Sequence, residues 1–315
     1  MLLTACSSAP EPTPPTEIPS SASSAAAPSP TPSPSAAFPI PMRPDRQLIR
    51  GGAKDVVQRM VEIVGNRPAL KLDVTETDVT LTFLTTDQKP LTLRWSDNKI
   101  SQVDSDVQYS GQATFRPADY PLGNISELFE TSAKLGAEGN DKVLQIIQYP
   151  QGEVLMTVST RPETKTIFFE RDGSALRNLG FVSVADLTEG IAAVTRGSRG
   201  TVIQVGLAPD MGYWADSPPT AKGVTERRTR RGALPVYLIR RNEASGLEPF
   251  DPQQIDALVL ARAISKFNAD DSPGCRVEID NRFKKETPIA RYNCDGVIHY
   301  TDLAGTEYTE QALRS

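Results

Sequence analysis

The chain has 315 residues, of which 38% are hydrophobic and 23% charged, and its formal net charge at pH 7 is -5. A chain with this acidic balance is not a nucleic-acid binder of the basic type, so we expect no nucleic-acid partner. The sequence also lacks a run of about 18 apolar residues, the length that a membrane-spanning helix needs, and this excludes a polytopic membrane protein.

The N-terminal residues carry the most specific pattern in the sequence. The run Leu3-Thr4-Ala5-Cys6 is followed by a pair of serines. A cysteine thiolate is the nucleophile that thioether formation needs, and small residues before it suit signal-peptide cleavage. This pattern resembles the lipobox of bacterial lipoproteins. The resemblance implies that Cys6 carries a diacylglyceryl group, that residues 1–5 are the remnant of a signal peptide, and that the protein is extracytoplasmic and lipid-anchored to the cell membrane.

Residues 7–45 have the composition of a spacer. They hold 12 of the chain's 26 prolines, few aliphatic residues and very few charges. Such a segment cannot bury enough apolar surface to offset the entropy lost on ordering, and proline favours an extended polyproline II conformation. We therefore expect residues 6–45 to be a lipidated cysteine and a disordered spacer, similar to those of actinobacterial lipoproteins. At about 3.1 Å per residue it would reach roughly 120 Å.

Four segments after the spacer have helical patterns. One apolar stripe at i, i+3, i+4 and i+7 comprises Val57, Met60, Val61 and Val64. A second helix is expected after the N-cap Ser183, with an apolar face of Leu187, Ile191 and Val194. A capping-box pattern at Asn124 and an Asp-Pro pair at Asp251 predict the start of two more helices.

The spacing of these helices indicates an internal duplication. A shift of 130 carries positions 57, 61 and 64 onto 187, 191 and 194, and Leu128-Phe129 onto Leu258-Val259. Alternating apolar and polar residues with short turns fill the gaps, which indicates antiparallel strands. We expect an α+β fold of two tandem copies of a helix–antiparallel strands–helix–antiparallel strands unit, over residues 46–180 and 181–315.

This order of elements resembles, over roughly residues 47–315, the tandem modules of PepSY-type and β-lactamase-inhibitor-type exported proteins. The likeness rests on the order of helices and strands. It implies a non-catalytic module that binds proteins or peptides.

Cys275 and Cys294 are the two cysteines that remain after Cys6. The segment between them has the pattern of a strand, a polar turn and a strand, and its midpoint falls between Lys284 and Lys285 in the turn. The cysteines should face each other across an antiparallel pair and form a disulfide in an oxidising compartment. A zinc site is the alternative, but the chain has a single histidine.

No motif in the sequence indicates catalysis. A Gly-x-Ser-x-Gly elbow and a Gly-rich phosphate loop are both absent, and His299 lies in an expected strand. Asp73, Glu76 and Asp78 cluster in one hairpin but lack the spacing of an EF-hand, so we expect a solvated turn. We therefore expect no enzyme activity, no cofactor and no metal ion.

Residues 208–232 are the candidate region for partner binding. We expect a long loop between strands, carrying aromatic and arginine residues of the kind that anchor interfaces. These residues are Tyr213, Trp214, Arg227, Arg228, Arg230 and Arg231. The arginines also suit anionic lipid headgroups or wall polymers. The alternative is a solvated loop with Trp214 tucked into the sheet, where it could form a short strand.

The anchor, the spacer, the duplication and the missing catalytic set favour one function. We expect a surface-tethered binding or accessory lipoprotein of the envelope, with a protein, a peptide or a cell-wall polymer as its partner. A carrier of lipid or a small ligand is one alternative, and it requires a large apolar cavity between helices and sheet. An envelope hydrolase is another, and it requires a cleft in which carboxylates and His299 converge.

Overall fold

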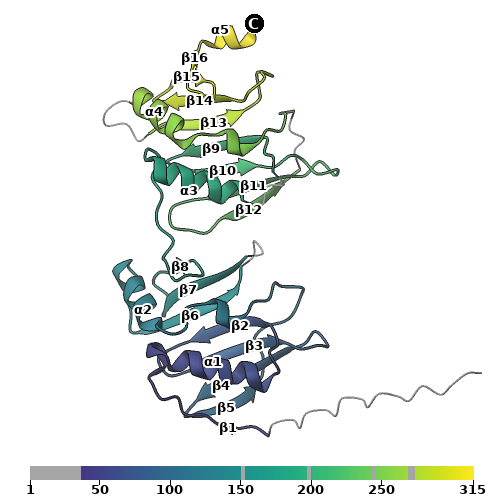
Figure 1. The fold of residues 1–315 in the computed structure, drawn as a ribbon, viewed down its shortest axis with the longest axis vertical. Helices are drawn as coiled ribbons and strands as arrows, with labels where there is room; N and C mark the ends of the chain where they lie inside the picture. The colour runs from purple at the N-terminus through teal and green to yellow at the C-terminus, as the bar shows by residue number, and fades with distance from the viewer. Residues whose placement is uncertain (1–36, 150–152, 197–199, 243–245, 269–273) are drawn as a thin grey trace, which may run out of the picture. The chain divides into compact units, whose positions relative to one another are not determined.

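A computed structural model describes residues 37–149, 153–196, 200–242, 246–268 and 274–315. Cys6 and most of the expected spacer lie outside these described residues. Residues 37–315 form one compact unit with two antiparallel sheets of eight strands and a few helices, so the expected α+β class is confirmed (Figure 1). None of the helices in the described ranges is long and apolar enough to span a membrane.

The first sheet has the strand order β1-β5-β4-β3-β2-β6-β7-β8. Its strands are β1 (Ile40–Pro41), β2 (Ala69–Val74), β3 (Val79–Leu84), β4 (Pro90–Ser96), β5 (Lys99–Val103), β6 (Asp141–Gln148), β7 (Val154–Arg161) and β8 (Ile167–Phe169). Helices α1 (Gly52–Ile63) and α2 (Ile125–Lys134) pack on it, with short 3-10 turns at Leu48–Arg50 and Pro117–Asp119. The other face of this sheet is therefore left without a helix.

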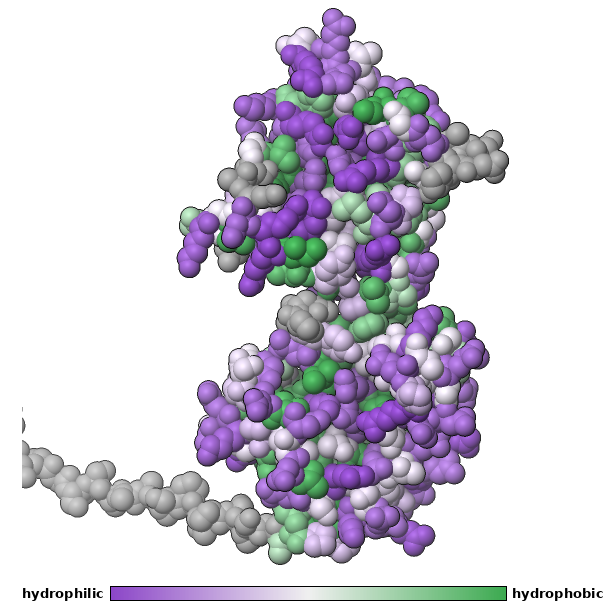
Figure 2. Space-filling view, turned by 180° about the vertical axis from the view of Figure 1, so that it is seen from behind, coloured by the Kyte–Doolittle hydropathy of each residue, from purple (hydrophilic) through white to green (hydrophobic). Residues whose placement is uncertain are grey.

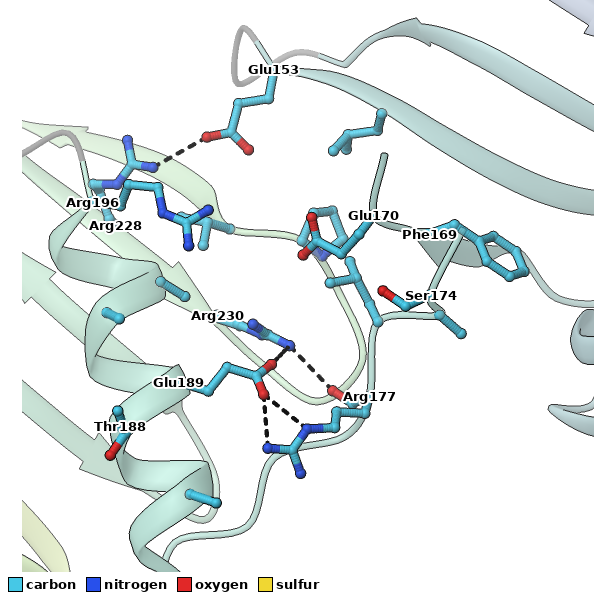
Figure 3. A pocket seen from close by; sticks show the side chains of 18 residues that line it. Glu153, Phe169, Glu170, Ser174, Arg177, Thr188, Glu189, Arg196, Arg228 and Arg230 are labelled. Carbon is cyan, nitrogen blue, oxygen red and sulfur yellow. Dashed lines mark hydrogen bonds and ion pairs between the residues drawn. The ribbon is translucent and has the colours of Figure 1, made fainter. Parts of the chain in front are cut away.

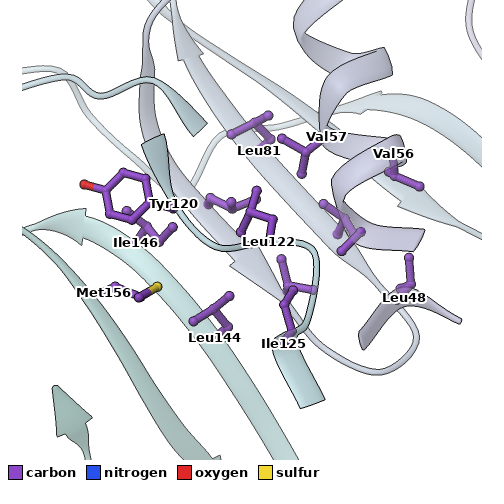
Figure 4. Packing of buried hydrophobic residues seen from close by; sticks show 14 of the residues in the cluster. Leu48, Val56, Val57, Leu81, Tyr120, Leu122, Ile125, Leu144, Ile146 and Met156 are labelled. Atoms are coloured by element: carbon purple, nitrogen blue, oxygen red, sulfur yellow. The ribbon is translucent and has the colours of Figure 1, made fainter. Parts of the chain in front are cut away.

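The predicted stripe of α1 faces this sheet. Val57 and Met60 are buried, and Figure 4 shows Val57 beside Leu81 of β3. Leu144 and Ile146 of β6 belong to the same apolar cluster, which fills the space between helices and sheet. Burial of such side chains, at about 25 cal/mol per Å² of apolar surface, is the main force that holds the helices on the sheet.

Two expectations at the N-terminal side of this sheet are wrong. The spacer does not extend to residue 45, because β1 pairs Ile40 with Ile100, and Trp95 Nε1 donates to the Met42 carbonyl at 2.8 Å. Phe38, Ile40 and Met42 pack against the core, which is the apolar burial that the preceding Pro/Ser-rich residues lack. Helix α2 does start after Asn124, as predicted, but the second expectation, a capping box there, is wrong because the Asn124 side chain makes no cap hydrogen bond.

The second sheet has the strand order β12-β11-β10-β9-β13-β14-β15-β16. Its strands are β9 (Gln204–Ala208), β10 (Gly212–Asp216), β11 (Thr225–Arg230), β12 (Tyr237–Arg241), β13 (Arg276–Asp280), β14 (Ile289–Cys294), β15 (Val297–Thr301) and β16 (Glu307–Tyr308). Helices α3 (Val184–Thr195) and α4 (Ala257–Phe267) pack on one face, and α5 (Glu310–Arg314) ends the chain. Helices α3 and α4 lie in front of the sheet in Figure 1. On the rear face, Leu313 of α5 packs against Ile289 and Tyr300 over β14 and β15, and in the described residues the rest of this face, which we call the open face, carries no helix.

The helix caps of the second sheet were predicted in part. The Ser183 side chain accepts a hydrogen bond from the Asp186 amide, as expected for the N-cap of α3. Asp251 instead caps only the 3-10 turn Pro252–Gln254, and Asp256 caps α4 by accepting from the Leu258 amide. The buried face of this helix begins at Leu260, while Leu258 stays exposed.

The expected disulfide between Cys275 and Cys294 is confirmed. Strands β13 and β14 pair Arg276 with Asn293, so the two cysteines occupy the next position of the same register. Their Cα atoms lie 4.3 Å apart. The bridge thus fixes one end of the β13–β14 pair, which carries part of the site described next.

Candidate functional site: an arginine-covered sheet face

The expected loop at residues 208–232 is wrong, because this stretch contains two paired strands. Strands β10 and β11 are antiparallel, with Trp214 opposite Thr229 and Asp216 opposite Arg227. Successive residues of a strand point to opposite faces of a sheet. The candidate residues of these strands are therefore divided between the two sides, while Arg231 follows β11 and is exposed.

Tyr213 points to the helix side and is a core residue. Its ring stacks on that of Phe181 with centroids 5.3 Å apart, and its hydroxyl donates to the Gly180 carbonyl. A Cβ atom on Gly190 of α3 would overlap the Tyr213 ring, so the helix packs directly on it. Burial raises the pKa of the Tyr213 hydroxyl. This side chain stabilises the fold and is not available to a partner.

Arg228 and Arg230 also point to the helix side, where they line a pocket of about 680 Å³ (Figure 3). The guanidinium groups of Arg230 and Arg177 both contact Glu189, at 2.9 and 2.7 Å. Arg228 lies 3.3 Å from Glu153. These arginines are thus engaged in ion pairs within the chain, and Arg230 is almost fully buried.

The open face of the second sheet carries a different arrangement, which we call the arginine network. In it, charged side chains and one glutamine form a single hydrogen-bonded chain across strands β12 to β14. The members are Gln204, Asp216, Arg227, Arg241, Arg276, Glu278, Asp280, Arg282 and Arg291.

Asp216 is the centre of one half of the network. It accepts two hydrogen bonds from Arg227, from Nε and Nη2, both at 2.7 Å. It also accepts from Arg241 at 3.1 and 3.2 Å. Gln204 continues the chain, because it accepts from Arg227 at 3.4 Å and donates to Asp280 at 3.0 Å.

Glu278 and Asp280 form the other half. Arg282 donates to Asp280 at 2.8 and 2.6 Å and to Glu278 at 3.1 Å. Glu278 also accepts from Arg276 at 3.0 Å and from Arg291 at 3.4 Å. Burial alone would raise the pKa of Glu278, but the hydrogen bonds from Arg282 and Arg276 outweigh it, so the pKa lies below its usual value. The carboxylate is therefore held in its charged form.

Depth separates the two signs of charge in this network. The carboxylate side chains of Asp216 and Asp280 are only 8% and 1% exposed. Arg276 and Arg282, by contrast, are 41% and 34% exposed. Arg227 and Glu278 lie between these extremes, at 16% and 14% exposed. The network holds five arginines and three carboxylates, an excess of two positive charges. Figure 2, seen from behind, shows hydrophilic side chains gathered across the second sheet.

Trp214 lies beneath the arginines of the network, tucked into the sheet as one of the two interpretations of the sequence had it, and is not an exposed interface anchor. Its side chain is fully buried. The guanidinium groups of Arg227 and Arg276 lie over its ring, 5.5 and 5.3 Å from the centroid. Cation–π contacts of this kind are worth about 0.5–2 kcal/mol each, more when desolvated. The indole therefore helps to fix both arginines in place.

His299 and the acidic hairpin were also singled out from the sequence. The His299 ring stacks on Phe267 of α4 with centroids 4.2 Å apart. It lines a pocket of about 370 Å³ with Glu307 and Glu310, but these carboxylates are paired with Lys266 and Arg314. In the first sheet, Asp73 is paired with Lys71 and Asp78 with Arg94. Among the described residues, no group of three or more His, Cys, Asp or Glu is placed to hold a metal ion.

Neither a protein-family model nor a curated protein matches the sequence. Solved structures that resemble the fold include the DNA polymerase III subunit beta from Pseudomonas aeruginosa (14% identity, 81% of this chain, TM-score 0.15) and the DNA polymerase beta subunit of Streptococcus pyogenes (13%, 78%, 0.14). The DNA polymerase accessory subunit from Kaposi's sarcoma-associated herpesvirus is another (9%, 81% of this chain and 92% of its own, 0.13). The aligned part spans only 63% and 58% of the two bacterial chains. Likenesses at these TM-scores support no functional argument.

Proposed function

We propose that this protein is a non-catalytic binding module of the cell envelope, anchored through an acylated Cys6, whose anionic partner docks on the arginine network. The observation that carries the proposal is the excess of arginines over carboxylates in the network, five to three, with Asp216 and Asp280 buried beneath the partly exposed Arg276 and Arg282. Such a layer presents positive charge from a chain that is acidic as a whole. Complementary charge of this kind steers encounter and selects partners.

Three arginines of the network leave the Nη1 side of the guanidinium group for a partner. Arg227 donates hydrogen bonds from Nε and Nη2 to Asp216, and Arg282 donates from the same two atoms to Asp280. Arg276 uses the same two atoms toward Glu278. In the described part of the chain, no hydrogen bond from Nη1 of these three residues is present. Charge-assisted hydrogen bonds from such donors to a carboxylate or phosphate are about twice as strong as neutral ones.

We further infer that the folded part consists of two tandem copies of one unit, residues 46–180 and 181–315. The positions at which the helices start support this inference. Helix α3 starts 132 residues after α1 (184 and 52), and α4 starts 132 residues after α2 (257 and 125). The strand orders β5-β4-β3-β2-β6-β7-β8 and β12-β11-β10-β9-β13-β14-β15 also correspond. The copies differ in charge on the open face, because a pocket there in the first sheet is lined by four aspartates and two arginines. The cationic face thus belongs to the second copy alone.

A capture experiment tests the binding proposal. The acylated full-length protein would be used to isolate envelope partners, with Arg276→Gln/Arg291→Gln as the variant. Both arginines contact Glu278, which keeps Arg282 as a partner in the variant, so the carboxylate is not left uncompensated. We expect the variant to lose its anionic partner. The control Arg240→Gln/Arg262→Gln removes two exposed arginines from outside the network and should retain it. Equal capture by all three proteins would overturn the proposal.

Anchoring is tested separately. Mass spectrometry of the mature N-terminus is expected to find a diacylglyceryl group on Cys6. A bare thiol at this position would rule out the anchor without touching the binding proposal.

A further inference from the structure

We propose that the anionic partner of the arginine network is a lipid bilayer rich in anionic headgroups, which contacts the part of the open face that α5 leaves uncovered. This inference rests on the proposed function above, namely that the open face binds anions. Three features of the face favour a lipid surface over other anions: the spread of its donors, its apolar margin and its modest charge.

The donors of the network are too widely spread to hold one small anion. Arg241 on β12 and Arg291 on β14 are separated by five strand-to-strand steps in the order β12-β11-β10-β9-β13-β14. At about 4.8 Å per step this is roughly 24 Å. A small-anion site needs donors that converge on one point, whereas these arginines are set side by side. They suit an extended array of separate negative groups.

Apolar side chains flank the arginines on the same face. Ile239 is paired with Arg227 and Tyr237 with Thr229, so both belong to the open face at its β12 edge. Ile298 on β15 is paired with Asn293, which is paired with Arg276, and it marks the other side. These three side chains are 42%, 37% and 41% exposed.

An apolar margin distinguishes a bilayer from a soluble polyanion. The boundary between headgroups and acyl chains accepts aliphatic and tyrosine side chains, and surface-bound proteins combine such residues with basic ones. A hydrated phosphate or carboxylate polymer offers no equivalent contact for Ile239 or Ile298. The combination therefore favours the lipid surface.

The excess positive charge of the network is small, so binding to a bilayer would depend on the proposed lipid anchor at Cys6. Two net positive charges near an anionic bilayer give about a thirty-fold gain in binding, from about 1 kcal/mol per charge. This is modest for a free molecule. A lipid anchor would hold the face at a high effective concentration beside the membrane, where a weak contact is occupied.

Vesicle sedimentation with the full-length Cys6→Ser protein tests the inference, since no acyl chain then contributes. We expect binding to phosphatidylcholine vesicles that contain phosphatidylglycerol and not to phosphatidylcholine alone, and a decrease as salt is raised. Arg276→Gln/Arg291→Gln should bind about thirty-fold more weakly. Arg240→Gln/Arg262→Gln, with the same change of net charge, should bind like the parent.

A second comparison separates lipid from polymer, with sodium polyphosphate as the soluble probe. Ile239→Ser should weaken vesicle binding and leave polyphosphate binding unchanged. Retention of polyphosphate without any vesicle binding would overturn the bilayer proposal and leave the anionic-partner proposal standing. Failure to bind either probe, together with equal partner capture by the arginine variants, would remove both.

Discussion

The indole of Trp214 occupies the place where a side chain on Gly206 would lie. The two residues are directly opposite each other on β10 and β9, and a Cβ atom built on Gly206 would overlap the six-membered ring of the indole. Because Gly206 has no side chain, the Trp214 indole fits against the sheet beneath the arginines of the network.

Gly206→Ala is expected to destabilise the protein by about 1–3 kcal/mol, because the added methyl group must displace a fully buried indole. Urea unfolding followed by circular dichroism would measure the change. Gly123→Ala is the matched control, since nothing lies within 4 Å of a Cβ atom at that position. Equal midpoints for both variants would show that the indole has space to move.

Asp280→Asn is expected to cost about 3 kcal/mol, the lower end of the range for breaking a buried ion pair, because Arg282 is partly exposed. The Asp280 side chain is 1% exposed, and in the variant Arg282 would keep only its hydrogen bond to Glu278 at 3.1 Å. Chemical denaturation gives the free energy of unfolding. Glu310→Gln serves as the control, since its pair with Arg314 lies on the surface and its loss should leave stability unchanged.

The lowered pKa of Glu278 predicts how the free energy of unfolding depends on pH. Its pKa in the folded protein lies below the usual value of 4.5, so its contribution is fully present above pH 4.5 and is lost as the pH falls through the lower, folded-state pKa. The free energy of unfolding should therefore decrease more steeply below pH 4.5 in the parent than in Glu278→Gln. Urea titrations at a series of acidic pH values would compare the two slopes, and parallel slopes would contradict the expectation.

Removal of the disulfide is expected to lower the free energy of unfolding by about 3 kcal/mol, the entropy cost of opening a loop of this length. The cysteines are 19 positions apart in sequence. Thermal unfolding of the parent with and without reductant would measure the loss. The Cys275→Ala/Cys294→Ala protein should unfold at the same temperature in both conditions, which separates the bridge from other effects of the reductant.

Features that depend on neighbours in the sequence could be predicted. The stripe of α1 and the N-cap Ser183 of α3 are short-range signals, and the structure has both. The pairing of Cys275 with Cys294 followed from a turn midway between them. In each case the residues that decide the geometry lie within about twenty positions of one another.

The arginine network could not be predicted in the same way. Strand β11 contains no apolar residue, so its sequence gives no alternation and was interpreted as a loop. Its arginines are accommodated by Asp216 and Glu153, which are 11 and 75 positions away. One local signal was used only in part. Charged and apolar residues alternate strictly from Arg276 to Asp280, and this segment was predicted as a strand, but the charged face that the alternation implies was not considered.

The layering of acids beneath arginines also determines how the molecule would turn in an electric field. An isoelectric point near 5.2 describes the total charge, and on that basis a negatively charged wall should repel the protein at neutral pH. Charge is distributed unevenly, however, and the torque on such a distribution acts before any contact is made. The excess of arginines in the network would therefore favour orientations in which the rear of the second sheet faces a negatively charged surface.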